Sequence, residues 1–157
     1  MKKHAPLTVW SAMLLGVAIL LGAEAEHITP FTGTWRLILA RSTFNPGPPF
    51  RSFTLTFTPD GTRHLELVRA DGQAVSVSLP WSDGKEVIPA ATQGMENTRV
   101  ISKIQANTVD DIWKQNGKII EKVHGVVSSD GRSLTITVDG PDSQGGAFHN
   151  QLTFEKQ

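Results

Sequence analysis

Short stretches in which apolar and polar residues alternate fill the chain after residue 26, and none of them keeps a helical period over three turns. The stretches are rich in Val, Ile, Thr and Phe, and turn residues interrupt them about every dozen residues. The interrupting turns are Pro59-Asp60-Gly61, Ala70-Asp71-Gly72, Ser82-Asp83-Gly84, Asn116-Gly117 and Ser129-Asp130-Gly131. Evenly spaced short strands with glycine turns are typical of an all-β antiparallel meander, sandwich or barrel. The pattern predicts about ten strands.

The turns also predict how the strands pair. Three-residue loops at the first three turns keep one face apolar over four strands, whereas two-residue loops mix the two faces. Asn116-Gly117 favours a two-residue loop, because a longer loop places Asp111 opposite Glu121. Ser129-Asp130-Gly131 is again taken as three residues. The predicted pairs are Leu55 with Leu65, Phe53 with Leu67, Leu67 with Val75, Leu65 with Val77, Leu79 with Val87, Trp113 with Ile120, Asp111 with Lys122, Val109 with His124, Val126 with Leu134 and His124 with Ile136.

These registers define one apolar face, which we predict to be the inner one. Its members are Trp35, Leu37, Leu39, Phe53, Leu55, Phe57, Leu65, Leu67, Val75, Val77, Leu79, Val87, Val100, Ser102, Ile104, Val109, Trp113, Ile120, Val126, Leu134, Ile136, Val138, Leu152 and Phe154.

Three long connections are predicted at the same end of the sheet, because successive loops of a meander alternate between its two ends. They are the segments 42–50, 89–98 and 139–149. A sheet of this size avoids bare edges most simply by closing into a barrel, and pockets in barrels favour the mouth. The long segments therefore indicate a ligand entrance, although insertions tolerated at the surface explain them equally.

Residues 1–25 have the pattern of a secretory signal peptide. Lys2 and Lys3 precede an apolar run of thirteen residues, Val9 to Leu21, and Ala23-Glu24-Ala25 supplies a small-residue cleavage site. The run is shorter than the roughly 20 residues of a spanning helix. We therefore predict cleavage before Glu26 and a single mature domain, 26–157, in the bacterial periplasm or secreted; an uncleaved anchor and a buried helix are the alternatives.

Charge and cysteine content narrow the classes of function. Fifteen Lys and Arg balance fifteen Asp and Glu, so the chain lacks the basic surplus that nucleic-acid binding needs. The absence of cysteine excludes disulfides and thiolate catalysis. No spaced ligand cluster or phosphate-binding glycine loop is present in the sequence. We predict no metal, no cofactor, no nucleic-acid partner and, once the signal is removed, no membrane association.

Two motifs resemble the calycin superfamily. Phe31-Thr32-Gly33-Thr34-Trp35 resembles the Gly-x-Trp opening of lipocalins and the opening of fatty-acid-binding proteins, and Leu152-Thr153-Phe154 resembles the last strand of the latter. The segment 33–52 is similar to small exported bacterial lipocalin-like proteins. The resemblance implies an up-and-down antiparallel barrel of about eight to ten strands around an apolar small molecule, with Gly33 and Trp35 at its closed base. The Arg-x-Tyr carboxylate clamp of fatty-acid-binding proteins is absent here.

A polar cluster interrupts the predicted inner face. Asp111 is expected opposite Lys122, with His124 two residues along and Ser102 alongside. Buried charges are costly unless paired, so the cluster is either a self-satisfied ion pair or an anchor for a ligand's polar group, with proton transfer as a third interpretation. Trp113 either covers a ligand or fills the core. The candidate ligand-binding residues are Asp111, Lys122, His124, Trp113, Ser102, Phe53, Leu55, Leu152 and Phe154.

The sequence thus predicts an exported protein that binds a small apolar or amphipathic molecule in a barrel lumen. The alternative is a protein-binding or inhibitor-type barrel with a filled core that recognises its partner through 42–50, 89–98 and 139–149. An enzymatic role is left open. A lumen of about 300 Å³ or more favours the small molecule.

Overall fold

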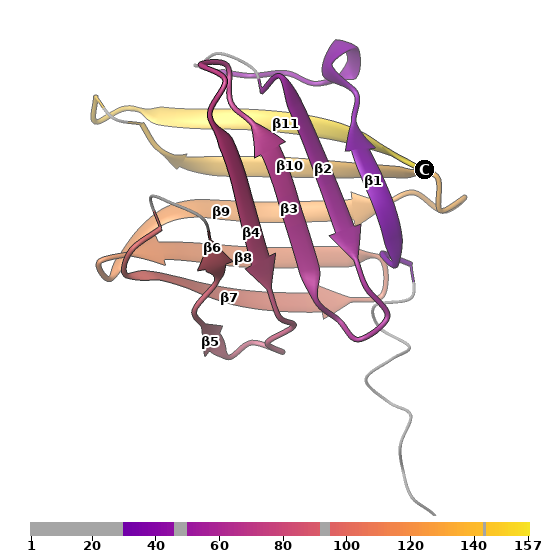
Figure 1. The fold of residues 1–157 in the computed structure, drawn as a ribbon, viewed down its shortest axis with the longest axis horizontal. Helices are drawn as coiled ribbons and strands as arrows, with labels where there is room; N and C mark the ends of the chain where they lie inside the picture. The colour runs from indigo at the N-terminus through magenta and orange to yellow at the C-terminus, as the bar shows by residue number, and fades with distance from the viewer. Residues whose placement is uncertain (1–29, 46–49, 92–94, 143) are drawn as a thin grey trace, which may run out of the picture.

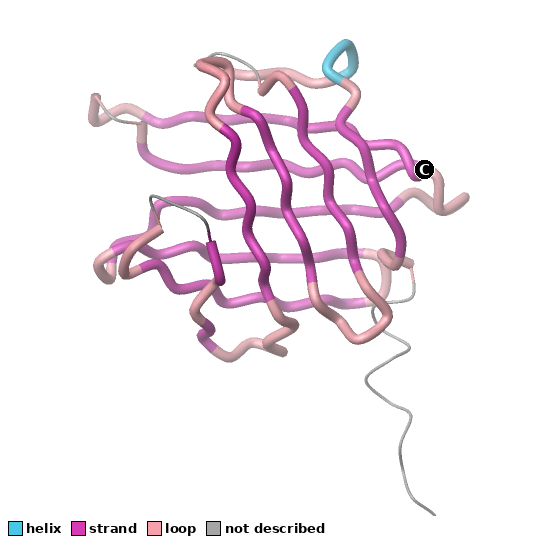
Figure 2. The backbone as a smooth tube through the Cα atoms, in the orientation of Figure 1, coloured by secondary structure: helices cyan, strands magenta, loops and turns pink. Residues whose placement is uncertain are grey.

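The computed structural model describes residues 30–45, 50–91, 95–142 and 144–157. Within them the chain is built from strands, with a single 3-10 turn, η1 (Leu39–Arg41), drawn in cyan in Figure 2. The strands are β1 (Gly33–Leu37), β2 (Ser52–Phe57), β3 (Arg63–Val68), β4 (Ala74–Leu79), β5 (Glu86–Val87), β6 (Ala90–Ala91), β7 (Thr98–Gln105), β8 (Thr108–Gln115), β9 (Lys118–Val127), β10 (Ser133–Pro141) and β11 (Ala147–Lys156). The predicted all-β class is confirmed. The predicted signal peptide, 1–25, lies outside the described residues.

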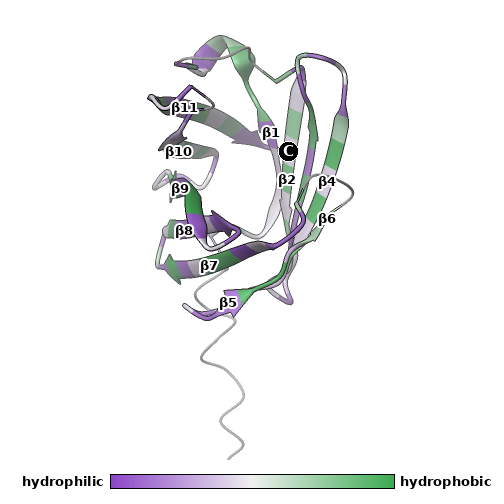
Figure 3. Cartoon of the chain, turned by 90° about the vertical axis from the view of Figure 1, so that its left-hand side faces the viewer, coloured by the Kyte–Doolittle hydropathy of each residue, from purple (hydrophilic) through white to green (hydrophobic). Residues whose placement is uncertain are grey.

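All eleven strands belong to one antiparallel sheet in the order β5-β7-β8-β9-β10-β11-β1-β2-β3-β4-β6. Strands that follow one another in the chain mostly lie side by side, and β1 joins the two halves by pairing with both β2 and β11. The sheet curls so that β1–β4 cross in front of β7–β11 (Figure 1), and the turned view in Figure 3 shows the two layers facing each other. The predicted up-and-down antiparallel barrel architecture is confirmed in this half-barrel form. Among the described residues, no helix is long and apolar enough to cross a membrane.

The two short strands close the seam between the layers. β6 pairs with β4 and β5 pairs with β7, so Ile88 and Pro89 connect the two sides. Nearer the end opposite the three long segments, the Ser82 hydroxyl accepts a hydrogen bond from the backbone N–H of Ser102 (3.0 Å). Gly84 N–H donates to the Ser102 carbonyl (2.7 Å). The segment after β4 therefore forms hydrogen bonds with the edge of β7 that does not pair with β8.

In the first half of the chain, the predicted registers hold across three strands. The four pairs predicted among β2, β3 and β4 are present, which confirms the three-residue loops at 59–61 and 70–72. The prediction at Ser82-Asp83-Gly84 is wrong, because the chain leaves β4 there to pair with β7. Val87 consequently lies opposite Val100 rather than Leu79.

In the second half, two local features shift the registers by one residue. Asn116-Gly117 does form a two-residue turn, but a β-bulge between Trp113 and Lys114 then places Glu121, not Ile120, opposite Trp113. The turn at 129–132 has four residues rather than three, so Val127 faces Leu134. The corrected pairs are Asp111 with Val123, Val109 with Gly125, and Ile136 with Gly125.

The shifts correct the predicted inner face. Most of its members are buried or partly buried as expected, including Val100, Ser102 and Ile104. The exceptions are Val126, whose inner place belongs to Val127, and Leu39, which lies in η1 and is 41% exposed.

The end of the barrel opposite the three long segments is solidly packed. Trp35 is fully buried, and its indole N–H donates to the carbonyl of Phe31 (2.6 Å). Lys156 lies over the indole ring, with Nζ 5.1 Å from the ring centroid. Gly33 has a φ of 124°, and a Cβ there would lie 2.9 Å from Lys156 Cε. Trp35 of the Gly-x-Trp motif is therefore a buried core residue.

The three long connections are more structured than predicted. β10 extends to Pro141 and β11 begins at Ala147, so strands occupy both ends of segment 139–149, and residue 143 between them lies outside the described residues. Residues 43–45 of segment 42–50 lie along β11, where Thr43 pairs with Gln151, and β6 falls within 89–98. Residues 46–49 and 92–94 of these segments lie outside the described residues.

Candidate ligand-binding lumen

A cavity of about 330 Å³ lies between the two layers of the sheet. Its wall comes from β2, β3 and β4 on one side and from β8, β9, β10 and β11 on the other. The lining side chains are mostly apolar or aromatic: Phe50, Phe53, Leu55, Phe57, Leu65, Leu67, Val75, Val77, Met95, Val109, Trp113, Val123, Ile136, Val138, Phe148 and Leu152. The charged and polar lining residues are Arg63, Arg69, Asp111, Glu121 and Asn150.

Each of the three predicted long segments contributes one apolar side chain to this cavity. They are Phe50 from 42–50, Met95 from 89–98 and Phe148 from 139–149. Phe50 packs edge-on against Phe53, with ring centroids 5.5 Å apart. The three segments therefore do meet around one cavity, as the alternation of loops predicts.

Arg63 and Asp111 form a buried ion pair in the cavity wall. Arg63 Nη1 and Nη2 donate to the two carboxylate oxygens of Asp111 at 2.7 and 3.0 Å, and Nη2 also donates to the Ser102 hydroxyl at 2.6 Å. The Arg63 guanidinium also lies 5.8 Å from the centre of the Phe57 ring. Each carboxylate oxygen of Asp111 already accepts a hydrogen bond, so the predicted self-satisfied ion pair exists, with a different cation.

Glu121 is the other acidic residue of the lining. No hydrogen bond or ion pair joins its carboxyl to another described residue. Burial raises the pKa of this carboxyl, and the positive charge of Arg69 lowers it by a smaller amount. Arg69 is exposed and follows directly after β3, and its guanidinium donates to Gln73 (3.1 Å). Glu121 therefore offers the cavity an acceptor that the protein itself leaves unused.

Two of the predicted site residues point away from the lumen. Lys122 lies opposite Ile112 and Asp139 on the outer face, because the bulge shifts the register by one residue and places Val123 opposite Asp111. His124 is likewise exposed, and its Nδ1 lies 2.7 Å from Asp110 Oδ1. The predicted pairing of Asp111 with Lys122, and the predicted inward position of His124, are therefore wrong.

The other predicted site residues lie in or next to the lumen. Asp111, Trp113, Phe53, Leu55 and Leu152 line the cavity. Ser102 and Phe154 are fully buried behind the lining, where Ser102 holds Arg63 and Phe154 packs against Phe53.

Arg63 and Glu121 are not among the predicted site residues, for different reasons. Arg63 shares a strand and a face with Leu65 and Leu67, so simple alternation already indicates an inward cation. Glu121 becomes inward only through the bulge, and nothing in the residues around 113–121 marks a bulge. Glu121 does share its face with Val123, but the sequence shows that this face of β9 is the inner one only once the register is known.

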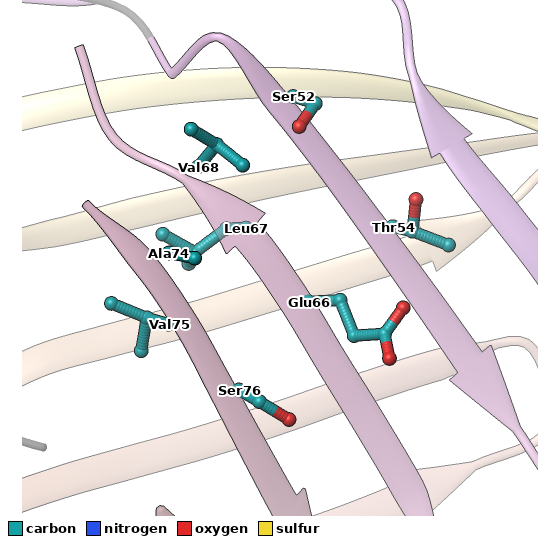
Figure 4. Close-up of a pocket in the computed structure, with 8 residues that line it drawn as sticks. All are labelled: Ser52, Thr54, Glu66, Leu67, Val68, Ala74, Val75 and Ser76. Atoms are coloured by element: carbon teal, nitrogen blue, oxygen red, sulfur yellow. The ribbon is translucent and has the colours of Figure 1, made fainter. Parts of the chain in front are cut away.

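A second, shallower depression lies on the outer face of β2, β3 and β4 (Figure 4). Its walls include Ser52, Glu66 and Ser76, whose side chains are exposed to solvent. Its volume is about 420 Å³ and half of its lining residues are apolar, but it is more open to solvent than the lumen. It does not enclose a ligand, so the lumen is the better candidate site. The described residues also contain no group of three acidic, histidine or cysteine side chains that could hold a metal ion.

No family model and no curated protein matches this chain. Among solved structures, it is similar to the crystal structure of the wild-type fluorescent protein UnaG, with a TM-score of 0.53 and 11% sequence identity. The similarity covers 83% of this chain and 99% of the UnaG chain. At this identity the likeness concerns the fold alone. Together with the curled antiparallel sheet, it shows that the domain has a calycin-like fold, as the opening motif implied.

Proposed function

We propose that this protein binds a small, at least partly apolar molecule in the lumen of its barrel. The observation that carries the proposal is the cavity of about 330 Å³ between the two layers. Small-molecule sites are typically cavities of about 300–1,000 Å³, lined by apolar and aromatic side chains with a few polar groups that orient the ligand. The lumen has this size and this composition.

The cavity favours a small-molecule ligand over surface recognition of a protein. A barrel that acts only through its loops has no need of an open interior, and close packing is the normal state of a protein core. Here Phe50, Met95 and Phe148 line the interior space from the three segments that the alternative function assigns to a protein interface.

We further propose that the domain acts after export, in the periplasm or outside the cell. The support is the signal-like pattern of residues 1–25. Amino-terminal sequencing of the exported protein tests this point. It is expected to begin at Glu26, and an intact amino terminus in the exported fraction contradicts cleavage.

A pair of substitutions on β9 tests binding in the lumen. Val123 lines the cavity and His124, the next residue, points outward. Val123→Trp fills the lumen, whereas His124→Trp adds the same indole to the surface. Native mass spectrometry of the exported protein is expected to show a retained small molecule in the wild type and in His124→Trp, but not in Val123→Trp.

Calorimetry with 1-naphthylmethanol, a neutral ligand with one apolar ring system, measures the effect of the same two substitutions on affinity. Val123→Trp is expected to weaken its binding at least about tenfold, a loss of 1.4 kcal/mol. Equal affinities for the two variants, or no binding to the wild type together with an empty native mass spectrum, would overturn the proposed function.

A further inference from the structure

The two carboxyl groups that line the lumen differ in whether protein groups already donate hydrogen bonds to them. Both oxygens of Asp111 accept hydrogen bonds from Arg63. Glu121 has no hydrogen-bond partner in the described part of the chain, although it is partly buried and lines the same cavity. A carboxyl group removed from water without a partner costs free energy. Glu121 thus has the character of a binding group rather than of a structural one.

The backbone is distorted locally in a way that brings Glu121 inside. Without the bulge, the turn at 116–117 directs Ile120 toward the lumen and Glu121 toward solvent. The bulge places Glu121 opposite Trp113 instead, while Ile120 stays partly buried against the core, and β-bulges commonly re-aim a side chain at a functional site. Gly140 on the neighbouring strand accommodates the distortion, since a Cβ there would lie 2.2 Å from the carbonyl oxygen of Ile120. A carboxyl group thereby joins the lining of a mostly apolar cavity.

Trp113 completes the surroundings of this carboxyl. It lies directly opposite Glu121 in the β8–β9 pairing, is 5% exposed and lines the same cavity. An aromatic ring attracts cations to its face, and a carboxylate forms charge-assisted hydrogen bonds with them. We propose that the lumen selects apolar molecules that carry a protonated amine, with Glu121 accepting the hydrogen bond of the ammonium group beside Trp113. This inference rests on the proposed function and specifies its ligand class.

The other charges that line the lumen fit this ligand class. Arg63 is neutralised by Asp111, so the deep part of the wall carries no net charge. Arg69 is exposed to solvent, is held by Gln73 and makes no ion pair with Glu121. An anionic ligand meets the like charge of Glu121 inside the cavity, whereas the solvated charge of Arg69 at its edge is screened.

Three probes that share one ring system test the inference by calorimetry on the full chain at neutral pH. They are 1-naphthylmethylamine, which is protonated, 1-naphthylmethanol, which is neutral, and 1-naphthoate, which is anionic. The amine is expected to bind about tenfold more tightly than the alcohol, and the alcohol more tightly than the carboxylate. Glu121→Gln is expected to abolish the advantage of the amine over the alcohol.

Two further variants serve as controls. Glu66→Gln removes a carboxyl from the outer face, in the depression of Figure 4, and is expected to leave all three affinities unchanged. Arg69→Gln removes the cation whose charge acts on Glu121 and is expected to tighten amine binding. If the alcohol binds but the amine binds no better, or if Glu121→Gln preserves the preference for the amine, the inference is wrong while lumen binding stands. If none of the probes binds, both fail.

Discussion

At the scale of single residues, the interior ion pair matters because charges out of water are stable only in complete networks. Two hydrogen bonds join Arg63 to Asp111, and the Ser102 hydroxyl accepts a third from the guanidinium. Removing one partner strands the other charge, and this costs more than the pair contributes as a whole. The two residues are therefore expected to tolerate joint replacement by apolar side chains better than the loss of either one.

A double-mutant cycle in urea tests this pairing. Asp111→Leu is expected to lower the free energy of unfolding by about 3–5 kcal/mol, because Arg63 is left buried without a counter-charge. Arg63→Met combined with Asp111→Leu is expected to recover most of that loss. Asp110→Leu, on the exposed face, is the control and costs about 1 kcal/mol or less. If the second change brings no recovery, the pairing is incorrect.

The titration of Glu121 supplies a second prediction. Its pKa is raised in the folded protein, so the folded state holds the proton more tightly than the unfolded chain does. The stability that this provides is present at acid pH and is lost as the pH rises through the folded-state pKa. Glutamine has no carboxyl group to ionise, so Glu121→Gln does not lose this stability as the pH rises. We therefore expect the variant to melt at a higher temperature than the wild type at pH 7.

Thermal unfolding without ligand between about pH 4 and pH 8 measures this effect, because glutamate normally titrates near the lower limit. The gain of Glu121→Gln over the wild type is expected to shrink toward zero at the acid end. Glu66→Gln, which is exposed, is expected to show no such gain. A Glu121→Gln variant that is less stable than the wild type at pH 7 shows that the carboxylate has a stabilising partner.

At the scale of elements, alternation and turn chemistry predict a register until a local irregularity intervenes. The loops at 59–61 and 70–72 follow the three-residue rule, and every predicted pair between β2 and β4 is present. A single bulge in the β8–β9 hairpin then changes which residues of β9 face inward. Since side chains alternate strictly, a shift of one residue exchanges the two faces, which is why Lys122 was predicted inside and Glu121 was missed.

Gly140→Ala probes the bulge itself. The added methyl group meets the carbonyl oxygen of Ile120 at 2.2 Å, and backbone at that distance has to move. Overpacking of this kind typically costs about 1–3 kcal/mol, and a displaced bulge moves Glu121 as well. We expect lower stability in urea and a weaker preference for 1-naphthylmethylamine over 1-naphthylmethanol. Thr137→Ala, on the same strand, is the control. Wild-type stability and selectivity in Gly140→Ala contradict this account of the bulge.

At the scale of the whole molecule, the barrel class was predictable because it depends on many residues at once. The spacing of turns and the apolar face define a curled antiparallel sheet even when individual pairs shift by one position. The seam was not predictable, since it depends on single hydrogen bonds between segments far apart in the chain. Ser82, for example, bonds to the backbone of Ser102 twenty residues later.

Ser82→Ala tests how the seam is held. The change removes the acceptor of the buried Ser102 N–H, and a buried donor without a partner costs about 1–3 kcal/mol. Hydrogen exchange at the Ser102 amide is expected to accelerate, while the amide of Leu134, on β10 three strands away in the same layer, keeps its protection relative to global unfolding. Ser129→Ala, in an exposed turn, serves as the control. Unchanged exchange at Ser102 shows that Ser82 does not hold the seam.

The central claim is that a small molecule occupies the space between the two layers, and methyl-group NMR during titration with 1-naphthylmethanol tests it most directly. Ring currents of the naphthyl group act only over short distances, so they distinguish the two faces of each strand. The account predicts large shifts for Val77, Val123 and Ile136, which line the lumen, and none for the outward Val68, Ile112 and Val126. Shifts confined to the outward methyl groups, or no shifts at a saturating concentration of the probe, contradict it.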